Sequence, residues 1–218
     1  MASLAKTKRR LYGLSFESEV YDGVDMRYAI AYQSKWVTCT FVGVDFRMSN
    51  FTGAKFYSCK FKKCNFSQAN FSSGEFVKCV FTNCSFEMAS LPTLVNGTEF
   101  SGCLMQYASL YDIIVHNSAF LDCNMHGADL RFSQAKGVRF DGSDLWGAAV
   151  NISCQFFDQA FDLEQVRIFL SIAGRKLAAL TADPKHEEMR VKLSGFCDVQ
   201  WKVVERLMRD ADEHDKPT

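Results

Sequence analysis

Nine cysteines and four histidines are the side chains of this 218-residue chain that could bind a metal or act as nucleophiles. Cys59 and Cys64 lie five residues apart, as do Cys79 and Cys84, and closely spaced thiolates are typical zinc ligands. The alternative is that these thiols are small apolar side chains of a core that repeats every five residues. The same spacing continues through positions without cysteine, which favours the core, and we predict no metal site.

The other reactive side chains do not converge on one place. His116 and His126 are expected on different outer surfaces, and His186 and His214 lie near the end of the chain. No Cys/His or Ser/His/Asp set is predicted to meet, and there is no glycine-rich phosphate loop. We therefore expect a protein that is not an enzyme and that needs no cofactor.

A strict five-residue period organises the middle of the chain. This period matches neither the 3.6 residues of a helix turn nor the two of a strand, so the chain must turn a corner once per repeat. The residue two places earlier is small in each case, so a large and a small side chain fill a narrow interior. The large positions are Phe41, Phe46, Phe51, Phe56, Phe61, Phe66, Phe71, Phe76, Phe81, Phe86 and Leu91.

The repeat resembles that of the pentapeptide-repeat family, in which a small residue precedes Asp or Asn and then Leu or Phe. The pattern is clearest in Ala69-Asn70-Phe71, Cys64-Asn65-Phe66 and Ala128-Asp129-Leu130. The resemblance implies an all-β solenoid, a right-handed quadrilateral β-helix with four repeats to a coil.

A four-sided coil predicts that residues twenty apart lie in one column, about 4.8 Å from their neighbours. Asn50 and Asn70 are such a pair, and Lys55 is expected beside Glu75. Seven of the nine cysteines occupy the small position, and each has a partner at this distance. The predicted columns are Cys39–Cys59–Cys79, Cys64–Cys84 and Cys103–Cys123.

The register divides the chain into three segments. Residues 1–15 form a basic N-terminal segment, a solvated tail or alternatively a nucleic-acid or targeting tail. Residues 16–155 form the β-helix. Because Phe100 is the next inward residue after Leu91, we predict a loop at 92–98, with Leu94 and Val95 available to a partner. A plain corner insertion is the alternative.

Residues 156–218 are predicted to form a pair of amphipathic α-helices, the second starting at Asp183-Pro184. An open end of a solenoid exposes an apolar cross-section, which such a pair could cover. The quinolone-resistance branch of the family, which the chain resembles in plan, dimerises through a C-terminal helix. Two interpretations therefore remain for the apolar stripe of the second helix: it forms a homodimer, or it only caps the solenoid. The stripe consists of Leu193, Phe196, Trp201, Val204 and Met208.

Charge and hydropathy limit the partners. The chain has 25 basic and 25 acidic residues, so no overall field draws it to nucleic acid or to a membrane. No apolar run approaches the 18 residues of a membrane span, and no export signal is recognised. With an odd number of cysteines, this indicates reduced thiols and a cytoplasmic protein.

Large apolar side chains at outward positions indicate a contact surface. Trp146 and His126 are twenty residues apart and are predicted to be neighbours on one face. Phe132 and Ile152 form a second outward pair. The alternative is that the C-terminal helices fold back and cover both pairs.

The resemblance to the quinolone-resistance type also implies a DNA mimic, which binds DNA gyrase and protects it from inhibitors, giving antibiotic resistance or self-immunity. Residues 16–91 carry seven acids and eight bases, whereas residues 99–155 carry six acids and three bases. The alternatives are an adaptor and a bacterial effector, which bind another protein through the loop, the aromatic face or the helical tail. For mimicry, the acidic strip would consist of Asp112, Asp122, Asp129, Asp141 and Asp144.

Overall fold

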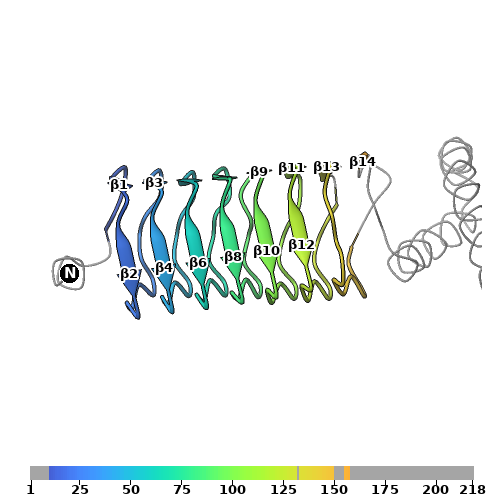
Figure 1. Cartoon of the computed structure of the whole chain (residues 1–218), viewed down its shortest axis with the longest axis horizontal. Coiled ribbons are helices and arrows are strands. Elements are labelled where there is room, and N and C mark those ends of the chain that lie inside the picture. Colours follow the sequence, from blue (N-terminus) through green and yellow to red (C-terminus); the bar gives the residue numbers. More distant parts are fainter. Residues whose placement is uncertain (1–9, 132, 150–154, 158–218) are drawn as a thin grey trace, which may run out of the picture. The chain divides into compact units, whose positions relative to one another are not determined.

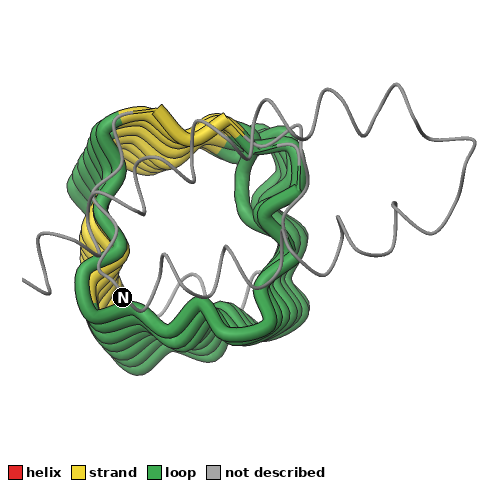
Figure 2. Tube along the Cα trace, turned by 90° about the vertical axis from the view of Figure 1, so that its right-hand side faces the viewer, coloured by secondary structure: helices red, strands yellow, loops and turns green. Residues whose placement is uncertain are grey.

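The computed structural model describes residues 10–131, 133–149 and 155–157. The chain divides into two compact units, Met1–Gln165 and Val166–Thr218, and all described residues belong to the first. In this unit the chain winds as a stack of coils in sequence order (Figure 1), and each coil has four sides (Figure 2). The predicted quadrilateral β-helix is confirmed. Within the described ranges there is no helix of the length and hydropathy needed to cross a membrane.

Two adjacent sides of each coil carry three-residue strands, which pair in parallel with those of the neighbouring coils (Figure 2). Side A contains β1 (Ser15–Glu17), β3 (Lys35–Val37), β5 (Lys55–Tyr57), β7 (Glu75–Val77), β9 (Leu94–Asn96), β11 (Ile114–His116), β13 (Gln134–Lys136) and β14 (Gln155–Phe157). Side B contains β2 (Val20–Asp22), β4 (Thr40–Val42), β6 (Lys60–Lys62), β8 (Val80–Thr82), β10 (Glu99–Ser101) and β12 (Ala119–Leu121).

The other two sides are held by single bridges between coils. Side C is centred on inward residues such as Phe46 and Phe66, with bridges such as Asp45 to Asn65. Side D is centred on Phe51 and Phe71, with bridges such as Asn50 to Asn70. The chain passes A, B, C and D in that order before it enters the next coil.

The interior is a set of aromatic columns. On side B the rings of Phe41 and Phe61 stack with centroids 4.7 Å apart, and Phe61 and Phe81 follow at 4.5 Å. Rings of adjacent sides meet edge to face, as Phe41 and Phe46 do at 5.5 Å. Both arrangements are favourable for aromatic quadrupoles, and the stacking distance matches the spacing of hydrogen-bonded strands. A Phe in each repeat therefore fits both the spacing of the hydrogen-bonded coils and the packing of the core.

The coil after β8 is one residue shorter than the others. Glu75 pairs with Leu94, an offset of nineteen, where Lys55 pairs with Glu75 at an offset of twenty. Val95 lies fully buried in the inward position of β9. The predicted loop at 92–98 is therefore wrong, because the chain omits one corner residue after Pro92 and re-enters the sheet at once.

Both predicted boundaries of the β-helix also shift. Leu11 is buried and its N–H donates to the carbonyl of Ile30 at 2.6 Å, so the register begins inside the segment predicted as a basic tail. At the other end, β14 continues side A through Phe157, into the segment predicted as helical. The remaining part of that prediction, at 158–218, lies outside the described residues.

The shortened coil merges two of the predicted thiol columns. Because the offset from the preceding coil is nineteen, Cys103 lies beside Cys84 as well as beside Cys123. The hydrogen bonds of Cys84 to Cys103 and Cys64, together with burial, raise its pKa far above that of a free thiol. The result is two continuous columns of buried, unbridged thiols, Cys39–Cys59–Cys79 and Cys64–Cys84–Cys103–Cys123.

Candidate functional site

The predicted acidic strip is not one surface. Asp112 and Asp129 belong to side D, and Asp144 belongs to side C. Asp141 lies on side B, and Asp122 lies at the corner that follows side B. The N–H of Asp122 donates to the carbonyl of Asp141 at 2.9 Å. Only Asp122, Asp141 and Asp144 gather along one edge, between sides B and C.

Arginines also reduce the negative charge of this group. Arg131 donates to both carboxylate oxygens of Asp129, at 2.8 and 2.6 Å, and these hydrogen bonds raise the pKa of Arg131. Arg139 lies 3.7 Å from Asp141. A DNA-like surface needs a dense row of unneutralised charges. The described coils therefore offer a small acidic edge in place of the predicted strip.

The predicted neighbours His126 and Trp146 both lie on side C. The N–H of Gly127 donates to the carbonyl of Trp146 at 2.9 Å, which places the two segments on successive coils. The Trp146 side chain is 55% exposed. The ring of Tyr107, one coil earlier, meets His126 edge to face at 5.8 Å. Side C thus presents an aromatic cluster at the later coils.

The cluster is part of a longer apolar surface that the sequence analysis missed. Among the described residues, twelve large apolar side chains are exposed, and six of them belong to this one side of four; we call these six the side C rib. Four of the six occupy corners, two places after an inward residue. A large apolar residue at such an outward corner position is the sequence signal that could have revealed them. The side C rib consists of Tyr28, Met48, Met88, Leu104, Tyr107 and Trp146.

The remaining predicted site residues fall into two groups. Val95 is buried in the core and cannot contact a partner, whereas Leu94 is half-buried beside it in β9. The others, of the second outward pair and the dimer or cap stripe, lie outside the described residues. They are Phe132, Ile152, Leu193, Phe196, Trp201, Val204 and Met208.

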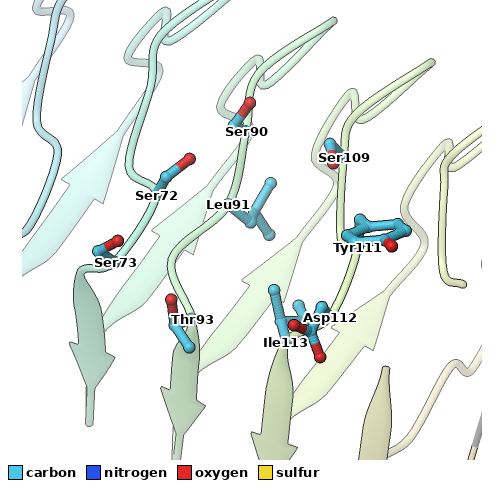
Figure 3. A pocket seen from close by; sticks show the side chains of 9 residues that line it. All are labelled: Ser72, Ser73, Ser90, Leu91, Thr93, Ser109, Tyr111, Asp112 and Ile113. Atoms are coloured by element: carbon cyan, nitrogen blue, oxygen red, sulfur yellow. The ribbon is translucent and has the colours of Figure 1, made fainter. Parts of the chain in front are cut away.

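A second feature is a hollow on side D at the shortened coil, which we call the notch (Figure 3). It has a volume of about 270 Å³. Leu91 and Ile113, both buried, contribute to its lining, and Tyr111 and Asp112 lie at one end. The rest of the lining carries hydroxyl groups, those of Ser72, Ser73, Ser90, Thr93 and Ser109. The predicted loop pointed to the right coil, but the surface feature there is a recess.

Within the described ranges, no three His, Cys, Asp or Glu side chains are grouped in a way that could hold a metal ion. The thiols of Cys59 and Cys64 instead point into the core, where they lie 3.5 Å from the carbonyl oxygens of Trp36 and Phe41. Their surroundings are those of small core side chains.

Comparison with known proteins places the sequence period in context. The family model described as pentapeptide repeats matches residues 49–87 and 115–147, with eight copies. No curated protein matches the chain.

Solved structures similar to this chain include a trypsin-treated form of QnrB1, a plasmid-mediated fluoroquinolone resistance protein. It is 18% identical over 72% of this chain and 82% of that one, with a TM-score of 0.43. HetL of Nostoc sp. strain PCC 7120, involved in the regulation of heterocyst differentiation, is 12% identical over 71% and 90%, with a TM-score of 0.21. A pentapeptide repeat protein of the Arabidopsis thaliana thylakoid lumen is 17% identical over 76% and 78%, with a TM-score of 0.17.

The matched stretches belong to the same register that the structure carries from Leu11 to Ala148. Eight recognised repeats, wound four to a coil with a large and a small side chain inside each, show that this chain contains pentapeptide repeats and resembles the proteins built from them.

Proposed function

We propose that this protein is a non-catalytic scaffold that binds another protein through side C. The observation that carries the proposal is the side C rib, in which Met88 is 61% and Tyr107 59% exposed on the outside of a rigid stack. Exposed Trp, Tyr and Met side chains are enriched at the centres of protein interfaces. Because the backbone of each rib position is fixed by its coil, little backbone conformational entropy is lost when a partner packs against the rib.

The surroundings of the rib fit a protein partner. Between the apolar side chains, side C carries ion pairs such as Arg47 with Asp45, at 2.7 Å, and Arg27 with Asp25, also at 2.7 Å. An apolar ridge bordered by polar and charged groups has the core and rim of an ordinary interface. The uneven spacing of the rib leaves a polar break at Gln68, so we expect the later coils, with Tyr107 and Trp146, to contribute most of the affinity.

The test is affinity capture with the full chain as bait. Replacing Tyr107 and Trp146 together by Ser should remove the specific partner while the melting temperature stays within a few degrees of the parent. The matched control is Tyr12→Ser with Tyr32→Ser, two exposed tyrosines of side D. If the control loses the partner and the side C variant keeps it, side C is not the binding surface.

DNA gyrase is the partner that the family resemblance implies, and the acidic edge of Asp122, Asp141 and Asp144 supports it as a second candidate. A supercoiling assay, with and without a gyrase poison, tests it directly. Protection or inhibition should weaken when Asp122 and Asp141 become Asn. The control Asp22→Asn changes the position on side B that corresponds to Asp141, six coils earlier. No effect on gyrase at any concentration would remove this candidate and leave the scaffold proposal standing.

A further inference from the structure

The notch exists because one residue is missing from a corner of side D. In the regular coils a residue with positive φ forms this corner, as Gln33 (55°) and Gly53 (68°) do. In the shortened coil Pro92 is followed directly by Thr93, which leads into β9. The corner is cut off, and a hollow of about 270 Å³ remains between the full corners of the coils on either side, at Ser73 and Asp112 (Figure 3).

The cut corner also interrupts the main-chain ladder. Elsewhere on this side the corner N–H donates to the next coil: Gln33 to the carbonyl of Thr52, and Gly53 to that of Ser72, both at 2.8 Å. By the same pattern Ser73 would donate to Pro92, but the described residues contain no such hydrogen bond. The notch therefore offers one main-chain donor and one main-chain acceptor to a ligand.

The side chains of the notch are equally available. No hydrogen bond from the hydroxyls of Ser73, Ser90 or Thr93 to another described residue is found, whereas Thr52, in a regular coil, donates its hydroxyl to Asn50 at 2.7 Å. Ser72 and Ser109 add two more hydroxyls in the same situation. Each hydroxyl can both donate and accept, so the rim suits a ligand with the same dual capacity.

The charge and the apolar side chains of the notch further limit the class of ligand that it can bind. Asp112 is exposed and no cation of the described residues pairs with it, so its negative charge disfavours an anionic ligand. A single carboxylate also provides too few ligands for a divalent cation. The exposed ring of Tyr111 provides apolar contact, whereas Leu91 and Ile113, each 3% exposed, border the notch as buried core side chains. Arg131 lies over that ring, with its guanidinium carbon 5.6 Å from the ring centre. A neutral ring with many hydroxyls and a C–H face matches these groups.

We propose that the notch binds a single sugar ring, either free or at the end of a glycan. The volume is below the usual 300–1,000 Å³ of drug-sized pockets, which restricts the occupant to about one ring. Asp112 accepts hydrogen bonds from adjacent sugar hydroxyls, the serines and Thr93 complete the polar contacts, and the ring of Tyr111 meets the C–H groups. The site lies on side D and is independent of the protein-binding surface proposed on side C.

The decisive variant restores the missing corner. Inserting Gly between Pro92 and Thr93 gives the shortened coil twenty residues and places Pro and Gly at the two central turn positions that they favour. This variant should melt at the parent temperature or above it, since the ladder is completed, and it should lose the notch. A milder variant, Asp112→Asn, removes the charge and keeps a residue that tolerates the positive φ of 53° at this position.

Binding is measured by calorimetry or by ligand-observed NMR on the full chain. The probes are the methyl glycosides of glucose, galactose, mannose and N-acetylglucosamine, and short oligosaccharides that end in each. We expect a dissociation constant in the millimolar range for at least one probe, weakened about tenfold or more in both variants. The control Asp22→Asn and the side C variant should bind sugar as the parent does.

Each outcome decides a specific point. Binding of a methyl glycoside identifies a free sugar as sufficient, and binding of oligosaccharides alone identifies a glycan end. Parent protein that binds none of the probes overturns the proposal, and so does an insertion variant that is folded and binds as well as the parent. Neither result affects the scaffold proposal, which is tested by capture of a protein through side C.

Discussion

At the scale of single residues, the protein depends on side chains that fit a column. Phe66 stacks on Phe46 and on Phe86 with centroids 4.9 Å away in each direction, and it meets Phe61 and Phe71 edge to face. It is 1% exposed. Phe66 is thus held by these four rings, and none of them can move to fill its place without leaving its own column.

Removing such a ring should be costly. Phe66→Ala is expected to lower the free energy of unfolding by about 3–5 kcal/mol, because the rigid columns cannot collapse into the cavity. Lys62→Ala, on the outside of β6, should change it by less than about 0.5 kcal/mol. Denaturant unfolding of the two variants measures both values. Equal losses would contradict the assignment of inward and outward positions.

The first aromatic of side B carries a polar atom that the core does not use. The hydroxyl of Tyr21 is buried and has no hydrogen-bond partner within the described coils, and burial raises its pKa. Tyr21→Phe continues the phenylalanine column and should raise the free energy of unfolding by up to about 1 kcal/mol.

Tyr57→Phe is the comparison for this substitution. The Tyr57 hydroxyl donates to Glu75 at 2.7 Å, so its removal should lower the free energy of unfolding. Thermal or urea unfolding of both variants distinguishes the two hydroxyls. A destabilised Tyr21→Phe protein would show that the Tyr21 hydroxyl has a partner.

At the scale of the repeat element, the corner imposes a backbone conformation. Outside the shortened coil, the described residue two places after an inward side chain has positive φ, whether it is a glycine, such as Gly53, or not, such as Lys63 (55°). Left-handed conformations cost most residues about 1–2 kcal/mol, and Asn less. The packing of the columns holds many non-glycine residues in this conformation.

Gly53 isolates the backbone cost from steric clashes. A methyl group there would have only ordinary contacts, the nearest with Gln33 at 3.4 Å, so Gly53→Ala should lose about 1 kcal/mol through φ alone. Gly53→Asn should lose less, because Asn adopts this conformation more readily. Melting curves of the two proteins give the order, and an Ala variant as stable as the Asn variant would contradict this account of the corner.

Pairs of strands also carry an electrostatic contact, which gives a pH dependence. Lys55 of β5 donates to Glu75 of β7 at 2.6 Å, and this hydrogen bond and that from Tyr57 lower the pKa of Glu75. A carboxylate whose pKa is lowered on folding contributes stability above its unfolded pKa, and loses it as the pH falls through the folded value.

The variant Glu75→Gln tests this contact. It should be less stable than the parent at pH 7, by no more than about 1 kcal/mol because the pair is partly exposed. The difference should shrink below pH ~4 and vanish once Glu75 is protonated in both states. Unfolding midpoints from pH 2 to 7 measure it, and a difference independent of pH would exclude the carboxylate as its cause.

At the scale of the whole β-helix, seven thiols lie in two unbroken columns, and none of them is bridged. The hydrogen bond to Cys59 and burial raise the pKa of Cys39, and the pKa of Cys59 is raised to about 12. At these two positions the raised pKa suppresses the thiolate, which is the reactive form. In both columns a reagent is also excluded by burial, since each of the seven thiols belongs to a residue that is at most 2% exposed. Reaction therefore requires unfolding of the coils around them.

A thiol reagent tests this protection. With Cys154 and Cys197 replaced by Ser, the native protein should react with no thiol on the timescale on which a denatured sample reacts with seven. The reaction rate should follow global unfolding as denaturant is added. Rapid modification of any column cysteine in native protein would show that the coils open locally.

The five-residue period determined the coil and its inward side chains, because a side of the coil is a local event that each repeat specifies for itself. The four sides came from the resemblance to pentapeptide repeats and from the pairs of residues twenty apart. Twenty-residue spacing even predicted which cysteines and which charged pairs are neighbours. By contrast, what happens at Pro92 was decided only by the tertiary structure. A count by fives passes over Val95, whereas pairing with β7 places it in the core.

Three features follow from that one missing residue or from the coil as a whole. The joined column of Cys64, Cys84, Cys103 and Cys123, the notch on side D and the dispersal of the acidic residues all depend on which coils become neighbours and on which side a residue faces. A linear count of charges assigns no side to Asp129 or Asp141. Sides are set when the ladder closes each coil on the one before it, and that step depends on contacts between residues far apart in the chain.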